Sequence, residues 1–173
     1  MSWSWARARR IGAAMLGVPM NVSMELSRVL ILDSSAEQFI TLAEQSPAPG
    51  RAPRSFAIKI GTAEAVAIDR RWRGDTPPRP QTHELLDNAI RALGGVLERM
   101  VIHRLENGTY YANLVIVRED EIVEVDARPS DAIALAVGCQ VPIEVAEEVL
   151  EESAEERPDI EPPIDAGEDD DDD

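Results

Sequence analysis

The sequence contains one cysteine, Cys139, among 173 residues, and its apolar runs are short. A single cysteine excludes an intramolecular disulfide framework and any zinc site built from several cysteines. No apolar run approaches the roughly 18–20 residues that span a bilayer, which argues against an integral membrane protein. We therefore expect a protein of a reducing compartment, the cytoplasm, with no membrane partner and no structural metal.

Three common catalytic motifs are missing as well. The sequence has no Gly-rich phosphate loop, no Ser-centred nucleophile elbow and no paired-histidine zinc motif. Any catalytic chemistry must therefore come from other combinations of side chains.

Basic residues are outnumbered, with 17 Lys and Arg against 33 Asp and Glu, for a net charge of −16. The segment 151–173 holds 13 acidic residues and one basic residue, a charge of −12, whereas residues 1–19 carry three arginines. We expect a disordered basic leader over 1–19, a folded domain over 20–152 and a disordered acidic tail over 153–173. The alternatives are an interfacial amphipathic helix for the leader and an autoinhibitory arm for the tail.

Hydrophobic patterning predicts an α+β domain with a mixed, largely antiparallel sheet and three to four short helices. Asn107-Gly108 predicts a hairpin because both residues tolerate positive φ. Thr62 and Thr82 are expected N-caps, and Gly138 is expected to end the third helix. Strands are expected near residues 20–32, 39–42, 56–60, 96–105, 109–117, 122–127 and 141–145, and helices near 63–71, 82–93, 130–137 and 147–152.

Chemically capable side chains gather at the ends of these elements, where functional sites commonly lie. In two segments an Arg-Pro pair directly precedes a helix with an acidic residue in its first turn, and these are Arg79 with Glu84 and Arg128 with Asp131. The structural interpretation is that these carboxylates complement helix dipoles and that the arginines pair with them. The functional interpretation is a phosphate and metal site, since guanidinium groups suit phosphate and carboxylates suit divalent cations.

The functional interpretation gives each residue a role. A divalent ion, Mg²⁺ or Mn²⁺, is expected to neutralise phosphate charge and activate water. The rival interpretation is that the arginines alone neutralise these carboxylates as ion pairs. The predicted metal ligands are Asp126 and Asp131, the predicted catalytic residues are His83 and Glu84 (Glu84 also as a possible third ligand), and the predicted phosphate-binding residues are Arg79 and Arg128.

Several strings together resemble the bifunctional nuclease family, a small domain of bacteria and plants. The resemblance covers about residues 20–152, and Glu84 stands where the family usually has Asp. The matching strings are Ile60-Gly61 with Glu64-Ala65, Arg79-Pro80-x-Thr82-His83, Gly94-Gly95, Gly108-Thr109-Tyr110-Tyr111-Ala112 and Val125-Asp126-Ala127-Arg128-Pro129-Ser130-Asp131-Ala132-Ile133-Ala134.

The resemblance implies a nuclease that cleaves both DNA and RNA. An enzyme that uses the ribose 2′-OH cannot cut DNA, so an external water is the expected nucleophile. The exposed edges expected of a small sheet also favour a homodimer. The alternative is a non-catalytic regulatory or interaction module with the same fold, which the acidic charge balance favours.

Overall fold

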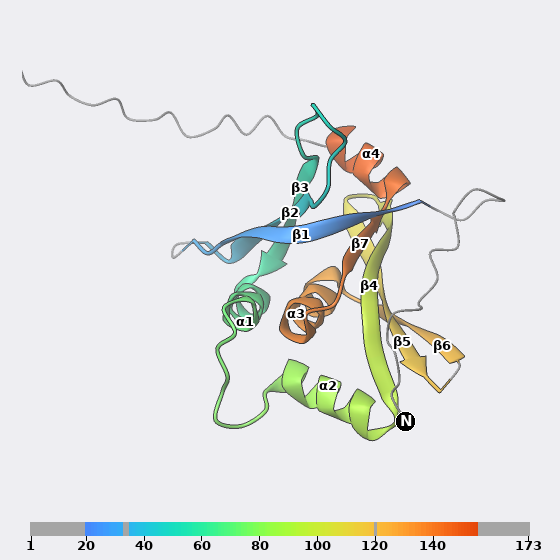
Figure 1. Ribbon diagram of the computed structural model, residues 1–173. Helices are drawn as coiled ribbons and strands as arrows, with labels where there is room; N and C mark the ends of the chain where they lie inside the picture. The colour runs from blue at the N-terminus through green and yellow to red at the C-terminus, as the bar shows by residue number, and fades with distance from the viewer. Residues whose placement is uncertain (1–19, 33–34, 120, 156–173) are drawn as a thin grey trace, which may run out of the picture.

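The computed structural model describes residues 20–32, 35–119 and 121–155. The predicted leader, 1–19, and residues 156–173 of the predicted tail lie outside this range. The described residues form an α+β domain built on one seven-stranded sheet with four helices (Figure 1), which confirms the expected fold class.

The sheet has the strand order β3-β2-β1-β7-β4-β5-β6. All neighbouring strands are antiparallel except β4 and β7, which are parallel. The bounds are β1 Asn21–Leu30, β2 Glu37–Glu44, β3 Ser55–Gly61, β4 Gly95–Glu106, β5 Thr109–Arg118, β6 Glu121–Ala127 and β7 Ile143–Ala146.

The last strand, β7, lies in the middle of the sheet between β1 and β4. The chain reaches this position from the edge strand β6 by way of α3, Pro129–Cys139, which crosses the face of β4 and β5. Six residues of α3 are buried, most of them Ala, Ile or Leu. A helix that is covered on nearly all sides explains why this segment is apolar throughout rather than amphipathic.

The sheet is curved enough to bring strands from its two halves together. The rings of Phe56 on β3 and Tyr110 on β5 stack with centroids 5.3 Å apart, although four strands separate β3 from β5 in the sheet order. The concave side is filled by α1, Thr62–Trp72, and α3, which pack against each other (Figure 1). The curvature thus places the end of β3 opposite the residues that follow β6.

The other two helices lie at the ends of the molecule. The helix α2, Thr82–Ala92, packs near the start of β4, and α4, Glu147–Glu155, contacts both β3 and β4. The fold therefore continues past the expected domain boundary at residue 152. Among the described residues, no helix has the length and apolar character needed to cross a membrane.

The structure confirms the predicted turn and corrects the two predicted helix caps. Asn107 and Gly108 have φ values of 52° and 72°, which confirms the predicted hairpin. The predicted caps Thr62 and Thr82 are wrong, because each is the first helical residue and the N-caps are Gly61 and Gln81. At α2 the Gln81 side chain accepts from the Glu84 backbone, and the Glu84 side chain accepts from the Gln81 backbone.

The prediction that Gly138 ends α3 is also wrong. The helix continues to Cys139, and the left-handed residue that ends it is Gln140, with φ of 56°. A Cβ atom at Gly138 would overlap the guanidinium group of Arg71 from α1. Gly138 is therefore required by close packing between two helices and not by a turn.

Candidate functional site

The candidate site is a cavity of about 560 Å³ between the end of β3 and the residues that follow β6. Its lining is largely apolar and also includes charged and hydroxyl side chains. The lining residues come from β2 and β3 (Glu37, Ile58, Lys59, Ile60, Gly61), from α1 (Glu64), from the β4–β5 hairpin and β5 (Gly108, Thr109, Tyr110, Tyr111), and from β6 and the start of α3 (Asp126, Ala127, Arg128, Pro129, Ser130).

Two helices begin at this cavity. Gly61 is the N-cap of α1 and Arg128 is the N-cap of α3, and both residues line the cavity. Pro129 fixes the first helical position of α3, where its missing N–H costs nothing. Each helix has an acidic residue in its first turn, Glu64 in α1 and Asp131 in α3, where the helix dipole favours negative charge.

Arg128 joins these two helix starts. Its Nη1 donates to Oε1 of Glu64 at 2.9 Å, and its Nε and Nη2 donate to the two carboxylate oxygens of Asp131 at 2.8 and 3.2 Å. Asp131 Oδ1 also lies 3.3 Å from Nε2 of His83, near the start of α2. We call the connected residues His83, Asp131, Arg128 and Glu64 the ionic chain.

The contacts of the ionic chain favour the ionised forms of Asp131 and Arg128. Burial opposes ionisation of Asp131, but hydrogen bonds from Arg128 and His83 outweigh it, so the pKa of Asp131 is lowered. Hydrogen bonds to Asp131 and Glu64 raise the pKa of Arg128. Arg128 uses three N–H groups in these contacts, and a guanidinium carries five, so two remain for a ligand. Its side chain is 65% exposed, which leaves those groups accessible.

His83 is well placed to accept a proton. Its side chain is 14% exposed and half-buried against the domain. If Nε2 carries the proton donated to Asp131, Nδ1 is left with the free lone pair. A carboxylate that fixes the tautomer of a histidine in this way also stabilises the imidazolium form once a proton is accepted.

Glu84 belongs to a separate cluster, although it follows His83 in sequence. Its Oε1 accepts from Arg70 at 2.7 Å and from Arg71, and its Oε2 accepts from the backbone N–H of Gln81 at 3.0 Å. Burial raises the pKa of Glu84, but the bonds from Arg70, Arg71 and Gln81 prevail and lower it to about 2. Both carboxylate oxygens of Glu84 are thus engaged within the domain, and its catalytic role stays a prediction.

The low pKa of Glu84 predicts a specific loss of stability in acid. The pKa of the folded state, about 2, lies below the ordinary value of 4.5, so the Glu84 ion pairs contribute fully above about pH 5.5 and are lost as pH falls toward 2. Glu84→Gln should have a lower melting temperature at pH 7 and a flatter decline between pH 5 and pH 2 than the wild type. Thermal melts of both proteins at pH 7 and between pH 5 and pH 2 measure this. Melting temperatures that fall in parallel in the wild type and the variant would contradict it.

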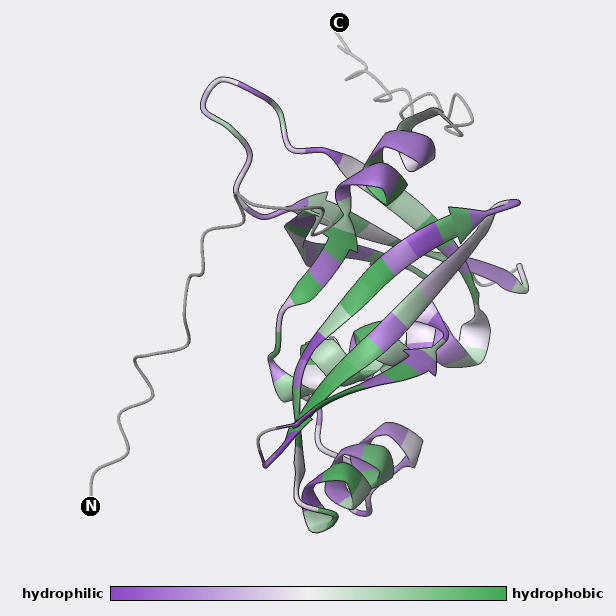
Figure 2. Cartoon of the chain, turned by 90° about the vertical axis from the view of Figure 1, so that its right-hand side faces the viewer, coloured by the Kyte–Doolittle hydropathy of each residue, from purple (hydrophilic) through white to green (hydrophobic). Residues whose placement is uncertain are grey.

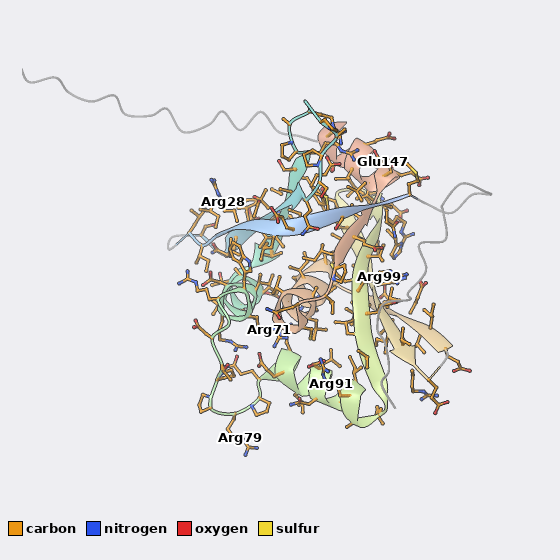
Figure 3. The ribbon with its side chains drawn as sticks, in the orientation of Figure 1. Arg28, Arg71, Arg79, Arg91, Arg99 and Glu147 are labelled. Atoms are coloured by element: carbon orange, nitrogen blue, oxygen red, sulfur yellow. The ribbon has the colours of Figure 1, made fainter. Side chains whose placement is uncertain are left out.

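The two remaining predicted residues differ in position. Asp126, the second-to-last residue of β6, lines the cavity beside Arg128. Arg79 lies in the loop between α1 and α2, is exposed, and points away from the helices (Figure 3). Arg79 does not line the cavity and has no hydrogen bond or ion pair within the described ranges. Of the predicted residues, Asp126 and Arg128 line the cavity, whereas Asp131 and His83 lie outside its lining and are joined to Arg128 through hydrogen bonds. Arg79 and the Glu84 carboxylate belong to neither group.

The three carboxylates of the predicted metal site are not assembled. Glu84 is occupied by two arginines, and Asp131 by Arg128 and His83. In the part of the chain that the structure describes, no group of three or more His, Cys, Asp or Glu side chains is arranged to hold a metal ion. The predicted set does not fit a single divalent ion, and the metal requirement stays a prediction.

Sequence reasoning missed Glu64 as a site residue. Glu64 occurs in one of the strings that carry the family resemblance, but nothing in the sequence places it against Arg128, which is 64 residues away. The available indication was that Glu64 lies in the first turn of a helix, as Glu84 and Asp131 do, although no Arg-Pro pair precedes it.

Comparison with known proteins covers most of the described residues. A family model described as "Bifunctional nuclease domain" matches residues 49–158, and this range includes the whole ionic chain. An uncharacterized protein of Mycobacterium tuberculosis (strain H37Rv) is 44% identical over 90 residues, 52% of this chain and 53% of that protein. A protein named "Bifunctional nuclease 1" from Oryza sativa subsp. japonica is 30% identical over 70 residues, 39% of this chain and 21% of that protein. The chain thus matches about half of the mycobacterial relative and a smaller share of the rice protein.

Proposed function

Because the chain belongs to the bifunctional nuclease domain family, we propose that it is a nuclease that hydrolyses phosphodiester bonds of DNA and RNA at the cavity beside β3 and β6. The observation that carries this proposal is the ionic chain. In this chain of contacts Arg128 presents an accessible guanidinium at the cavity, and the Asp131 carboxylate orients the imidazole of His83.

The proposed roles follow from the remaining hydrogen-bonding capacity of each group. Arg128 binds a phosphate oxygen with the two N–H groups that Glu64 and Asp131 do not use, and these two carboxylates fix the plane of its guanidinium. His83 accepts the proton of the attacking water at Nδ1, and Asp131 stabilises the resulting imidazolium. An external water serves both DNA and RNA because it does not depend on a 2′-OH.

The cavity also supports a nucleotide-sized ligand. Apolar side chains such as Ile58 and Ile60 offer a surface for a base, while Thr109 and Arg128 suit the sugar and the phosphate. We retain a dependence on Mg²⁺ or Mn²⁺ as a prediction, with no step assigned to the ion.

One observation favours a different function, a non-catalytic binding module. The basic side chains of the cavity are already paired, Lys59 with Glu37 at 3.0 Å and Arg128 with Glu64 at 2.9 Å, and Asp126 adds a further acidic group. Nucleic-acid-binding surfaces usually show an excess of basic residues. An interaction module needs no such excess, so activity measurements have to separate the two functions.

The decisive experiment compares highly purified wild-type chain with Asp131→Asn on plasmid DNA and on single-stranded RNA. We expect the wild type to cleave both and the variant to lose at least about 100-fold in rate, because the base loses its orienting carboxylate. Asp69→Asn is the matched control, since Asp69 forms an ion pair with Arg73 on the outside of α1. Equal traces of activity in all three proteins would support the binding module. A parallel series with a chelator and with added Mg²⁺ or Mn²⁺ tests the predicted metal.

A cytoplasmic location and a homodimeric state complete the proposal. The single cysteine, Cys139, agrees with a reducing compartment. The edge strand β6 is exposed along almost its entire length, and such edges commonly pair or become covered.

A further inference from the structure

The helix α2 has its hydrophobic side turned away from the protein. None of its 11 residues is buried, although it has a strongly amphipathic sequence. Leu85 is 62% exposed, Leu86 is 41% exposed, and Leu93 at the C-cap is 76% exposed. The half-buried residues of α2 are His83, Glu84, Asp87 and Ile90.

This orientation is held by polar contacts of the inner side. Glu84 bonds to Arg70 and Arg71, and His83 contacts Asp131. Ile90 makes the apolar contact, since a Cβ at Gly95 would lie 3.1 Å from its Cγ2 and 3.0 Å from Cγ2 of Ile116. Because these contacts fix the inner side, the leucines cannot turn inward without breaking the Glu84 ion pairs.

The exposed surface of α2 continues onto the edge of the sheet. Ile116, which lies beside Ile90, pairs across the strands with Val123, and Val125 follows on the same face of β6. Val123 is 40% exposed and Val125 is 41% exposed. We define the α2–β6 face as Leu85, Leu86, Leu93, Val123 and Val125. Figures 1 and 2 show α2 at the lower end of the molecule, beside β4 and clear of α4.

The charges around this face indicate a protein partner. The charged residues of α2 are Glu84, Asp87 and Arg91, and all are paired, with Arg91 lying 2.9 Å from Asp87. A nucleic-acid surface needs unpaired basic groups, and a helix that lies on a membrane is rich in Lys and Arg. Neither feature is found on α2, and the charged residues of β6 (Glu121, Glu124 and Asp126) are all acidic, so a complementary apolar surface is the partner that matches the α2–β6 face.

The size of the face matches a second copy of the chain. Its five side chains expose on the order of 400 Å² of apolar surface, which lies in the range of the largest patches on soluble proteins. A standard interface buries about 800 Å² on each partner, slightly more than half of it apolar. We propose that the α2–β6 face is the interface of a twofold symmetric homodimer, in which α2 packs against the same face of the second copy. In this dimer the second copy would cover the outer side of α2, and the inner side of the same helix carries His83.

The test is the mass of the full chain in solution, measured by sedimentation between about 1 and 100 µM. We expect a wild-type dimer, and Leu93→Lys should raise the dissociation constant of the dimer at least about 30-fold, because a charge replaces the most exposed leucine of an apolar interface. Val66→Lys is the matched control, since Val66 is 51% exposed on α1 and lies outside the face. Far-ultraviolet circular dichroism checks that both variants fold.

Two results would overturn the proposal. One is a wild-type monomer at 100 µM, and the other is a dimer that Leu85→Lys and Leu93→Lys together leave as tight as the wild type. Neither mass measurement depends on catalysis, so failure of the interface and failure of the proposed nuclease activity are distinguishable.

Discussion

Replacing His83 by alanine should reduce the rate of DNA and RNA hydrolysis by about 10²–10⁴-fold, which is the usual contribution of a general base. Asp131 lies 3.3 Å from Nε2 of this ring, and in the proposed mechanism Nε2 carries the proton donated to Asp131 and Nδ1 is the proton acceptor. The substitution removes that acceptor and leaves Asp131 bonded to Arg128, so the fold should persist. Single-turnover cleavage of a labelled oligonucleotide, together with a thermal melt, measures both effects.

The chain provides its own control, because it has only two histidines. His103 lies on β4, is exposed, and lines a separate hollow with Arg99 and Asn113. His103→Ala should retain wild-type activity. If both substitutions reduced hydrolysis equally, or if neither did, His83 would not be the general base, and the role of the ionic chain would be limited to stability.

Replacing Arg71 by alanine should lower the free energy of unfolding by about 3–5 kcal/mol, the usual cost of removing one partner of a buried ion pair. The Arg71 side chain is 6% exposed, contacts Glu84, and donates from Nε to the backbone oxygen of Ala134 at 2.6 Å. Its removal leaves the Glu84 carboxylate with Arg70 alone and leaves the Ala134 oxygen without this donor. Domains of this size have a total stability of about 5–15 kcal/mol, so the loss should be large in urea denaturation.

A neighbouring arginine controls for the loss of charge alone. Arg73 is 68% exposed and pairs with Asp69 one helical turn away, so Arg73→Ala should cost less than about 1 kcal/mol.

The close approach of Arg71 to Gly138 allows a second test, of the coupling between these two residues. Gly138→Ala should destabilise the wild type, because its Cβ displaces the guanidinium. In the Arg71→Ala background the same change should be stabilising by up to about 1 kcal/mol, since alanine is the better helix former. Equal effects in both backgrounds would show that the two residues are not coupled.

Local sequence patterns determined most of the elements of this protein. The hairpin at Asn107-Gly108 and the start of α3 at Pro129 depend on the φ preferences of one or two residues, so the sequence predicts them directly. Alternating apolar residues likewise predict the strands, because the two faces of a strand alternate whatever its neighbours are. The N-caps were wrong by one residue, since threonine and the residue before it compete for the same position.

The candidate site was predicted only in part, because its contacts join distant segments. Arg128 and Asp131 lie three residues apart at one helix start, and the sequence alone suggested that they interact. Their connection to Glu64 depends on α1 and α3 beginning at the same cavity, and their connection to His83 depends on the packing of α2 against α3. Glu84 shows the opposite outcome, since its position in the first turn resembled that of Asp131 but the tertiary structure pairs it with Arg70 and Arg71.

The sequence by itself therefore determined the family, the order of strands and helices along the chain, and the acidic and basic residues that end them. Only the tertiary structure decided that β7 inserts between β1 and β4, that Gly138 makes room for Arg71, and that the leucines of α2 face outward. The physical reason is the range of the interactions. Turn preferences and hydrophobic periods act within a few residues, whereas strand order and buried ion pairs depend on which segments the folded sheet brings together.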